Sequence, residues 1–424
     1  GPEVTEAPAA CNGIGDGTTF LHNGYALGQY FYNGLTSDAM VGAVFQLPEL
    51  MLFLPEANEA HRAVVNFRYV DANGQAGNFI QVARRLIAPP IGDPEAVVGE
   101  WLLFGNQNRV HSSIQSVIVR REQLAPGAGS GAGLFGWAPN SRFETAFNIY
   151  VKHDGPGSVG LRAARVKGPG LPPAGVVLTP PDPTACTTQD WMNVRRKDGL
   201  TDPGSATRIN ANGTWFLVNR TQGVTGPEAM VRRPNPNEGN ANNNQYVNWA
   251  HPLDYGAQPG SGDYIDFSQL RAMTVYTFEF FYEGEAQPRH TYDKALLTAM
   301  TPATRASSLQ WLTLDSAGKR VLDPADPLAA AATELPVSWH ANALVEPVSS
   351  VGIYARGPQG TVTQAGVRVP VGANSVIAPA PAGAACGAGA EFPTLIADGS
   401  SYRIIAMRYR MLDGSNKTSF TQFN

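Results

Sequence analysis

Apolar and polar residues alternate with a period of two along much of the chain. Between residues 64 and 70, Val65, Phe67 and Tyr69 alternate with polar residues, and the segment 147–151 repeats the pattern. Successive side chains of a β-strand point to opposite faces of the sheet, so this alternation is typical of strands with one buried face. The pattern predicts a mainly β fold.

Turn residues occur where such strands would be joined. Asn73-Gly74 separates an expected strand at 64–70 from one at 79–87, and Asp413-Gly414 follows an expected strand at 402–411. Both dipeptides readily adopt the positive φ angles that tight hairpins require. About eight short strands are expected before residue 167, a spacing that favours a β-sandwich or jelly roll.

Helical signals and domain boundaries are few. Asp326 as N-cap, followed by Pro327, predicts a short helix up to residue 334, and a second helix is expected at 292–300. The break after an expected strand at 274–282 divides the chain into a domain at 1–288 and another at 289–424. The Pro- and Gly-rich stretch at 168–183 gives an alternative boundary near 167–186.

The composition indicates a folded, turn-rich chain with little charge. Its 424 residues include 45 Gly and 33 Pro, 43% are hydrophobic and only 16% are charged. The hydrophobic content excludes a disordered protein, and a polar surface with few charges suits extensive protein contact. Because no run of 18 apolar residues occurs, no membrane span is expected.

The sequence lacks the residue spacings of the familiar catalytic motifs. The seven His form no H-x-x-x-H or H-E-x-x-H pair, no G-x-S-x-G is present, and Cys11, Cys186 and Cys386 form no C-x-x-C pair. The glycines of 131–136 fit G-x-G-x-x-G, but Pro139 argues against the helix that a dinucleotide site needs. We therefore expect a structural protein without a cofactor rather than an enzyme.

Two pairs of carboxylates offer oxygen ligands to a cation. Asp263 with Asp266, and Asp323 with Asp326, could contribute to a Ca²⁺ shared between subunits, because Ca²⁺ binds several converging oxygens. No EF-hand spacing accompanies them. Helix capping and turn formation are the roles expected of these side chains.

Arginine outnumbers lysine 25 to 6 and occurs in doublets. The candidate nucleic-acid-binding residues are Arg84, Arg85, Arg120, Arg121, Arg195, Arg196 and Lys197. The guanidinium fork binds phosphate bidentately, so doublets gathered on one face would form a nucleic-acid interface. On a strand, however, alternation would place the two neighbours on opposite faces.

Net charge limits how much nucleic acid these residues can neutralise. The formal net charge is −4, which divides into 20 − 26 = −6 for residues 1–288 and 11 − 9 = +2 for residues 289–424. If the protein packages RNA, most of the neutralising charge must come from a basic N-terminal segment that precedes Gly1.

The segment 270–284 reads L-R-A-M-T-V-Y-T-F-E-F-F-Y-E-G and is followed by Pro288. It resembles the last shell strand of tombusvirus-like and nodavirus-like coat proteins, in which an alternating aliphatic and aromatic strand leads into a hinge. This resemblance covers less than a tenth of the chain.

The final residues 421–424, T-Q-F-N, are similar to the site at which nodavirus and tetravirus coat-protein precursors cut themselves. The resemblance implies self-cleavage after Asn424 by cyclisation of its side-chain amide onto its own carbonyl, with a carboxylate as base. The reaction requires a residue after Asn424.

Together these resemblances imply a capsid protein of a small icosahedral positive-strand RNA virus. They imply a jelly-roll β-sandwich shell domain at 1–288 and a β-rich projecting domain at 289–424. Copies would assemble in multiples of sixty around the RNA genome, in the host cytoplasm, and the outer domain of the virion would attach to a host-cell receptor.

A different class of protein also fits the sequence. A glycan- or receptor-binding β protein of a phage tail or bacterial surface would use exposed aromatic rings as flat stacking surfaces. The candidate residues for this alternative are Trp191, Trp215, Trp249 and Trp311.

Overall fold

The computed structural model describes residues 21–26, 40–56, 60–88, 92–124, 142–181, 190–194, 216–221, 228–229, 266–382, 389–411 and 413–423. Strands make up 50% of it and helices 7%, which confirms the predicted mainly β class. The chain forms two compact units: unit 1 contains residues 1–111 and 154–159, and unit 2 contains residues 112–153 and 160–424.

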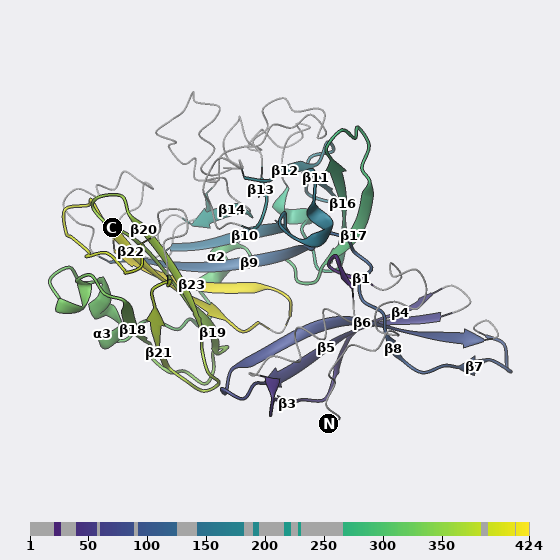
Figure 1. Cartoon of the computed structure of the whole chain (residues 1–424), viewed down its shortest axis with the longest axis horizontal. Coiled ribbons are helices and arrows are strands. Elements are labelled where there is room, and N and C mark those ends of the chain that lie inside the picture. The colour runs from purple at the N-terminus through teal and green to yellow at the C-terminus, as the bar shows by residue number, and fades with distance from the viewer. Residues whose placement is uncertain are drawn as a thin grey trace. The chain divides into compact units, whose positions relative to one another are not determined.

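Unit 1 is built on one long antiparallel hairpin, β5 (Ala60–Val70) and β6 (Ala76–Ala88) (Figure 1). Gly74 in its turn has a φ of 72°, and the Asp71 carboxylate accepts the backbone N–H groups of Asn73 and Gln75. The hairpin predicted around Asn73-Gly74 is therefore confirmed.

Short strands flank this hairpin on both sides. β3 (Val44–Phe45) and β4 (Glu49–Glu56) pair with β5, whereas β7 (Val97–Val98) and β8 (Leu102–Leu103) pair with β6. Also in unit 1 are a two-stranded ladder of β1 (Leu21–His22) and β2 (Tyr25–Ala26), and the 3₁₀ turn η3 (Pro156–Ser158).

The described residues of unit 2 form three sheets. The eight-stranded sheet has the order β15 (Glu228–Ala229), β14 (Phe216–Thr221), β10 (Arg142–Val151), β9 (Ser112–Gln123), β23 (Asn416–Phe423), β22 (Tyr402–Tyr409), β19 (Val348–Arg356) and β20 (Val362–Arg368). The five-stranded sheet has the order β13 (Asn193–Val194), β12 (Val176–Thr179), β11 (Leu161–Lys167), β16 (Thr274–Tyr282) and β17 (His290–Leu296). The third sheet pairs β18 (Glu334–Ser338) with β21 (Ser375–Pro379).

The pairing of β9 with β23 is parallel, unlike the other pairings between named strands in the described part of the chain. It joins the hairpin of β9 and β10 to the C-terminal hairpin of β22 and β23. The latter confirms the strand predicted before Asp413-Gly414, because β22 precedes these two residues and pairs with β23. Gly414 has a φ of 78°, as a tight turn requires.

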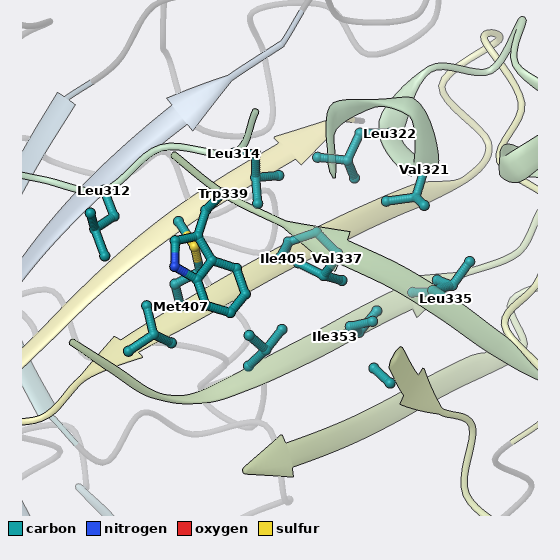
Figure 2. Packing of buried hydrophobic residues seen from close by; sticks show 14 of the residues in the cluster. Leu312, Leu314, Val321, Leu322, Leu335, Val337, Trp339, Ile353, Ile405 and Met407 are labelled. Atoms are coloured by element: carbon teal, nitrogen blue, oxygen red, sulfur yellow. The ribbon is translucent and has the colours of Figure 1, made fainter. Parts of the chain in front are cut away.

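The main hydrophobic core of unit 2 lies between the eight-stranded sheet and the segment 312–345 that crosses it. Figure 2 shows Trp339 packed near Met407 and Ile405, with Val337 and Leu335 following along β18. These side chains are almost completely buried. A second contact, between Phe147 and Tyr276 with ring centroids 5.2 Å apart, packs β10 against β16 of the five-stranded sheet.

Arg403 on β22 is a fully buried cation within this core region. Its two terminal nitrogens donate to the backbone carbonyls of Val321 (2.7 Å), Leu328 (3.3 Å), Ala329 (3.2 Å) and Pro393 (2.7 Å). Burial lowers the pKa of the guanidinium below its ordinary value, to about 10. The side chain therefore ties two irregular segments to the sheet.

Helices are short in the described residues. Besides η3, they are α2 (Ala303–Ala306), α3 (Ser316–Lys319) and the 3₁₀ turns η5 (Phe267–Gln269), η6 (Arg320–Leu322) and η7 (Pro327–Ala329). Asp326 caps η7 by accepting the N–H of Leu328, as predicted, but η7 ends at Ala329 rather than near residue 334. No helix in the described part of the chain combines the length and apolar character that a membrane span requires.

The predicted helix at 292–300 is wrong, because most of that segment is β17. Its residues pair in regular register with β16, which places Tyr292 opposite Phe278 and His290 opposite Phe280. Strand pairing thus overrides a local sequence compatible with a helix. The turn between these two strands also means that residue 288 lies inside a hairpin of unit 2.

The predicted division at 288 therefore does not coincide with the division between the two compact units. The alternative boundary at 167–186 begins at the end of β11 and contains its partner β12, so it too falls within unit 2. The jelly roll and the separate C-terminal domain stay predictions.

Candidate interaction surface

Arg84 and Arg85 lie on β6 in unit 1 and point to opposite faces of the sheet. Arg84 is paired across the hairpin with Arg62, and both guanidinium groups lie over the ring of Phe104, at 5.4 and 5.6 Å from its centroid. Arg85 lies 4.8 Å over the ring of Trp101 on the other face. The doublet therefore does not form one continuous cationic patch.

Arg120 and Arg121 lie on β9 in unit 2, and each has a carboxylate beside it. Arg120 is 3.3 Å from Glu122, and Arg121 Nε is 2.9 Å from Oε1 of the buried Glu144. The Arg121 contact is a close ion pair without hydrogen-bond alignment. Carboxylate partners reduce the charge that these two arginines could offer to a phosphate.

The remaining candidates for nucleic-acid binding or cleavage lie outside the described residues. They are Arg195, Arg196, Lys197 and Asn424. The nucleic-acid interface and the self-cleavage stay predictions.

The acidic pairs form turns and caps where the structure describes them. Hydrogen bonds from Ser268 and Gln269 lower the pKa of Asp266, and the hydrogen bond from Arg320 lowers that of Asp326. Asp323 accepts the N–H of Ala325. These are the roles expected from the sequence, while Asp263 lies outside the described residues. In the described ranges no three His, Cys, Asp or Glu side chains gather as metal ligands would.

A half-buried ionic cluster joins two strands of the five-stranded sheet in unit 2. Glu279 on β16 accepts hydrogen bonds from Arg165 and from Lys167 on β11, the latter at 3.1 Å. Burial raises the pKa of Glu279, but the two basic partners outweigh it and leave the pKa below its ordinary value. The cluster stabilises the pairing of β11 with β16.

The largest unexplained feature is the apolar surface of unit 1. Of 23 large hydrophobic side chains that are exposed in the described residues, fifteen belong to this unit. They are Val41, Val44, Phe45, Leu47, Leu50, Phe53, Leu54, Ile80, Leu86, Val97, Val98, Trp101, Leu102, Leu103 and Val159. Large exposed apolar patches are rare on soluble monomers and mark interaction sites.

The strand register places several of these residues on one face of the hairpin sheet. Leu54, Arg62, Arg84 and Leu102 are cross-strand partners in one row, and Leu86 lies beside that row on β6. Leu86 and Leu102 are 59% and 63% exposed. Two guanidinium groups stacked on Phe104 thus sit beside these leucines, and farther along the same face Asn66, Arg68 and Asn78 form a polar cluster with Glu49.

The opposite face of the same sheet carries an aromatic cluster. Phe67 and Phe79 are cross-strand partners whose rings stack with centroids 5.1 Å apart, and Phe45 and Tyr69 pack around Phe79. Ala63 and Ala83 on this face are buried. Both faces of the hairpin are therefore rich in apolar groups.

Our sequence reasoning did not identify this surface, although β6 contains the signal. Phe79 and Ile80, and again Leu86 and Ile87, are adjacent apolar pairs, so apolar side chains occur on both faces of one strand. A strand in a sheet with one solvated face should alternate instead. Adjacent apolar residues in a strand therefore predict that both faces are covered in the working protein.

The tryptophans proposed for glycan or receptor binding are not exposed platforms where the structure describes them. Trp311 packs against the core of unit 2 and donates its Nε1–H to the Ala306 carbonyl at 2.9 Å, and Trp191 is only partly exposed. Trp215 and Trp249 lie outside the described residues. Trp101, which was not a candidate, is 41% exposed.

Comparison with known proteins adds no family to this picture. The sequence matches no protein-family model, and no curated protein is significantly similar to it.

Proposed function

We propose that the protein is a viral capsid protein that self-assembles into an icosahedral shell around an RNA genome. The observation that carries the proposal is the exposed apolar surface of unit 1. Taking roughly 150–200 Å² for a large apolar residue, the exposed fractions of the fifteen side chains amount to more than 1,000 Å². A stable interface needs about 800 Å² from each partner, and the apolar area of unit 1 is divided between the two faces of the hairpin sheet.

Further features support assembly over catalysis. Low charge and numerous turns suit repeated contacts between copies, and a mainly β scaffold is compatible with a jelly-roll shell. In this proposal the shell domain is followed by an outward C-terminal domain that attaches to a host receptor. The protein is not an enzyme beyond a single self-cleavage after Asn424.

RNA would be bound mainly by a basic segment outside these 424 residues, because the net charge of −4 gives little attraction to phosphate. The ion pairs of Arg120 and Arg121 support this view. The mature protein would reside in the virion after assembly in the host cytoplasm.

Electron microscopy of the purified full chain tests the proposal. We expect closed shells of uniform diameter, tens of nanometres wide, under at least one condition in a grid of salt concentration and pH. Monomers or small oligomers across the whole grid would refute it.

A glycan- or receptor-binding β protein is the second candidate, and the exposed ring of Trp101 favours it. The ring is held between the Arg85 guanidinium and Phe53, whose centroid is 6.3 Å away, so one edge of an aromatic platform reaches solvent. Glycan-array binding that is lost in Trp101→Ala but kept in Trp311→Phe would support this candidate. Equal binding by both variants would count against it.

A further inference from the structure

A cluster of an arginine, a histidine and two aromatic rings lies on one face of the hairpin sheet of unit 1, at the end far from the turn. His61 on β5 is the cross-strand partner of Arg85 on β6, so their side chains point to the same face. Phe53 on β4 packs against the imidazole with ring centroids 4.9 Å apart. Trp101, just before β8, lies under the Arg85 guanidinium. Four segments of unit 1 therefore contribute to one cluster.

His61 orients the guanidinium of Arg85. The Nε–H of Arg85 donates to Nδ1 of His61 at 3.0 Å. A ring nitrogen that accepts a hydrogen bond carries no proton, so this bond is made by the neutral imidazole. His61 thus fixes the direction of the guanidinium and leaves its positive charge in place.

The two aromatic rings lie beside this cation and reach the surface. The guanidinium carbon is 4.8 Å from the centroid of the Trp101 ring, a distance at which a cation is attracted to the face of an indole. Phe53 meets Trp101 edge to face, at 74° and 6.3 Å. Phe53 and Trp101 are 42% and 41% exposed. The cluster therefore presents an oriented cation next to exposed aromatic surface.

Arg85 differs from arginines that are neutralised by a carboxylate. Its contacts with the described residues are the hydrogen bond to His61 and the stacking on Trp101. Elsewhere in the described ranges, six arginines lie within ion-pair distance of Asp or Glu; they are Arg68, Arg120, Arg121, Arg165, Arg289 and Arg320. Because Nε of Arg85 is used by His61, a ligand would meet its two terminal nitrogens.

We infer that this cluster binds an acidic sugar through the carboxylate of that sugar. The two terminal nitrogens of Arg85 can donate parallel hydrogen bonds to the two carboxylate oxygens, the geometry in which arginine binds this group best. Arg85 is half-buried, which strengthens its attraction to an anion relative to a fully solvated cation. The ring of the sugar then packs its apolar face on the exposed part of Trp101.

The combination of charge and rings favours an acidic sugar over two simpler ligands. A small inorganic anion would contact the guanidinium and leave Trp101 and Phe53 unused. A neutral sugar would stack on the rings and leave the cation without an anion. The inference rests on the second candidate function, the glycan-binding protein, and names the class of sugar that its Trp101 site would take.

The first test varies the ligand and leaves the protein unchanged. Saturation-transfer NMR titrations of the full chain would use sialyllactose, its methyl ester, lactose and a hyaluronan oligosaccharide, which carries glucuronic acid. We expect at least one of the two acidic sugars to bind. The methyl ester and lactose should bind on the order of tenfold more weakly than sialyllactose if sialic acid is the source of the carboxylate, because both lack the charge-assisted hydrogen bonds. Binding of hyaluronan alone would identify a uronic acid as the source.

The second test uses Arg85→Gln, with Arg84→Gln as matched control. The two variants make the same change of charge at adjacent positions of β6 whose side chains point to opposite faces. The dissociation constant of the acidic sugar should rise on the order of tenfold or more in Arg85→Gln and stay at the parent value in Arg84→Gln. Circular dichroism checks that both variants fold. If Arg85→Gln does not fold, the comparison of acid and ester decides the question.

The outcomes separate this inference from the functions on which it depends. Equal binding of sialyllactose, its ester and lactose would overturn the inference and leave the glycan-binding candidate standing. Binding of neither acidic sugar while lactose binds would have the same meaning, whereas a chain that binds none of the sugars would overturn the candidate as well. Inorganic sulfate that binds as tightly as the acidic sugar would overturn the assignment to a sugar, as would equal affinities of Arg85→Gln and Arg84→Gln.

Discussion

Arg403 gives the sharpest prediction about the stability of unit 2. Replacement by Met removes the guanidinium and its four hydrogen bonds to the backbone carbonyls of Val321, Leu328, Ala329 and Pro393. Of these carbonyls, that of Ala329 keeps the N–H of Leu395. At about 1.5 kcal/mol for each hydrogen bond from a charged donor, the loss is about 6 kcal/mol.

Removing the buried charge offsets part of this loss. Burial lowers the pKa of Arg403 below its ordinary value, to about 10, which corresponds to about 3 kcal/mol of cost for keeping the cation in the core. The net effect expected for Arg403→Met at pH 7 is therefore a destabilisation of about 3 kcal/mol. The variant is expected to be less stable because the hydrogen bonds lost with the guanidinium contribute more than the desolvation cost that its removal relieves.

Urea unfolding measures this difference directly, with Arg356→Met as control. Arg356 is exposed on the neighbouring strand β19, so its replacement should change the free energy of unfolding by less than about 0.5 kcal/mol. Hydrogen exchange should also show faster exchange at 320–329 in Arg403→Met. A variant as stable as the parent would refute the view that Arg403 ties these segments to the sheet.

Burial lowers the pKa of Lys294 to about 8, so the fold bears a charge-burial cost below pH 8 that is relieved between pH 8 and 10.5. Lys294→Met should therefore be more stable than the parent at pH 7, with an advantage that shrinks by pH 10 in thermal melts; an advantage independent of pH would contradict this. The lowered pKa of Glu279 contributes stability above its ordinary pKa of 4.5 that is lost as pH falls, so Glu279→Gln should melt earlier at pH 7 and match the parent at low pH. A gap that persists at pH 3 would argue against the ionic cluster. A Cβ on Gly318 would lie 2.1 Å from the backbone oxygen of Ser338, whereas one on Gly366 meets nothing within 4 Å. Gly318→Ala should thus cost at least about 2 kcal/mol of unfolding free energy and Gly366→Ala almost none, and equal effects in calorimetry would refute the close approach.

The parts of the fold that sequence could predict are those set by local chemistry. Alternation and Asn73-Gly74 were sufficient for the long hairpin of unit 1, because a turn with positive φ and a period of two need only neighbouring residues. The cap at Asp326 was predictable for the same reason.

The remaining parts depend on partners distant in sequence. The helix predicted at 292–300 failed because pairing with β16 decides the conformation of that segment. The parallel pairing of β9 with β23 joins segments about 300 residues apart, and the partners of Arg403 are backbone carbonyls that no side-chain motif reveals. The alternation rule did anticipate the opposite orientations of Arg84 and Arg85.

The molar mass of the assembled protein tests the central proposal most directly. Mass photometry of the purified full chain should reveal a discrete species of sixty copies, roughly 2.7 MDa for a chain of 45.1 kDa, or a multiple of it. A distribution that stops at monomers and dimers under all conditions of salt and pH would contradict a shell-forming protein.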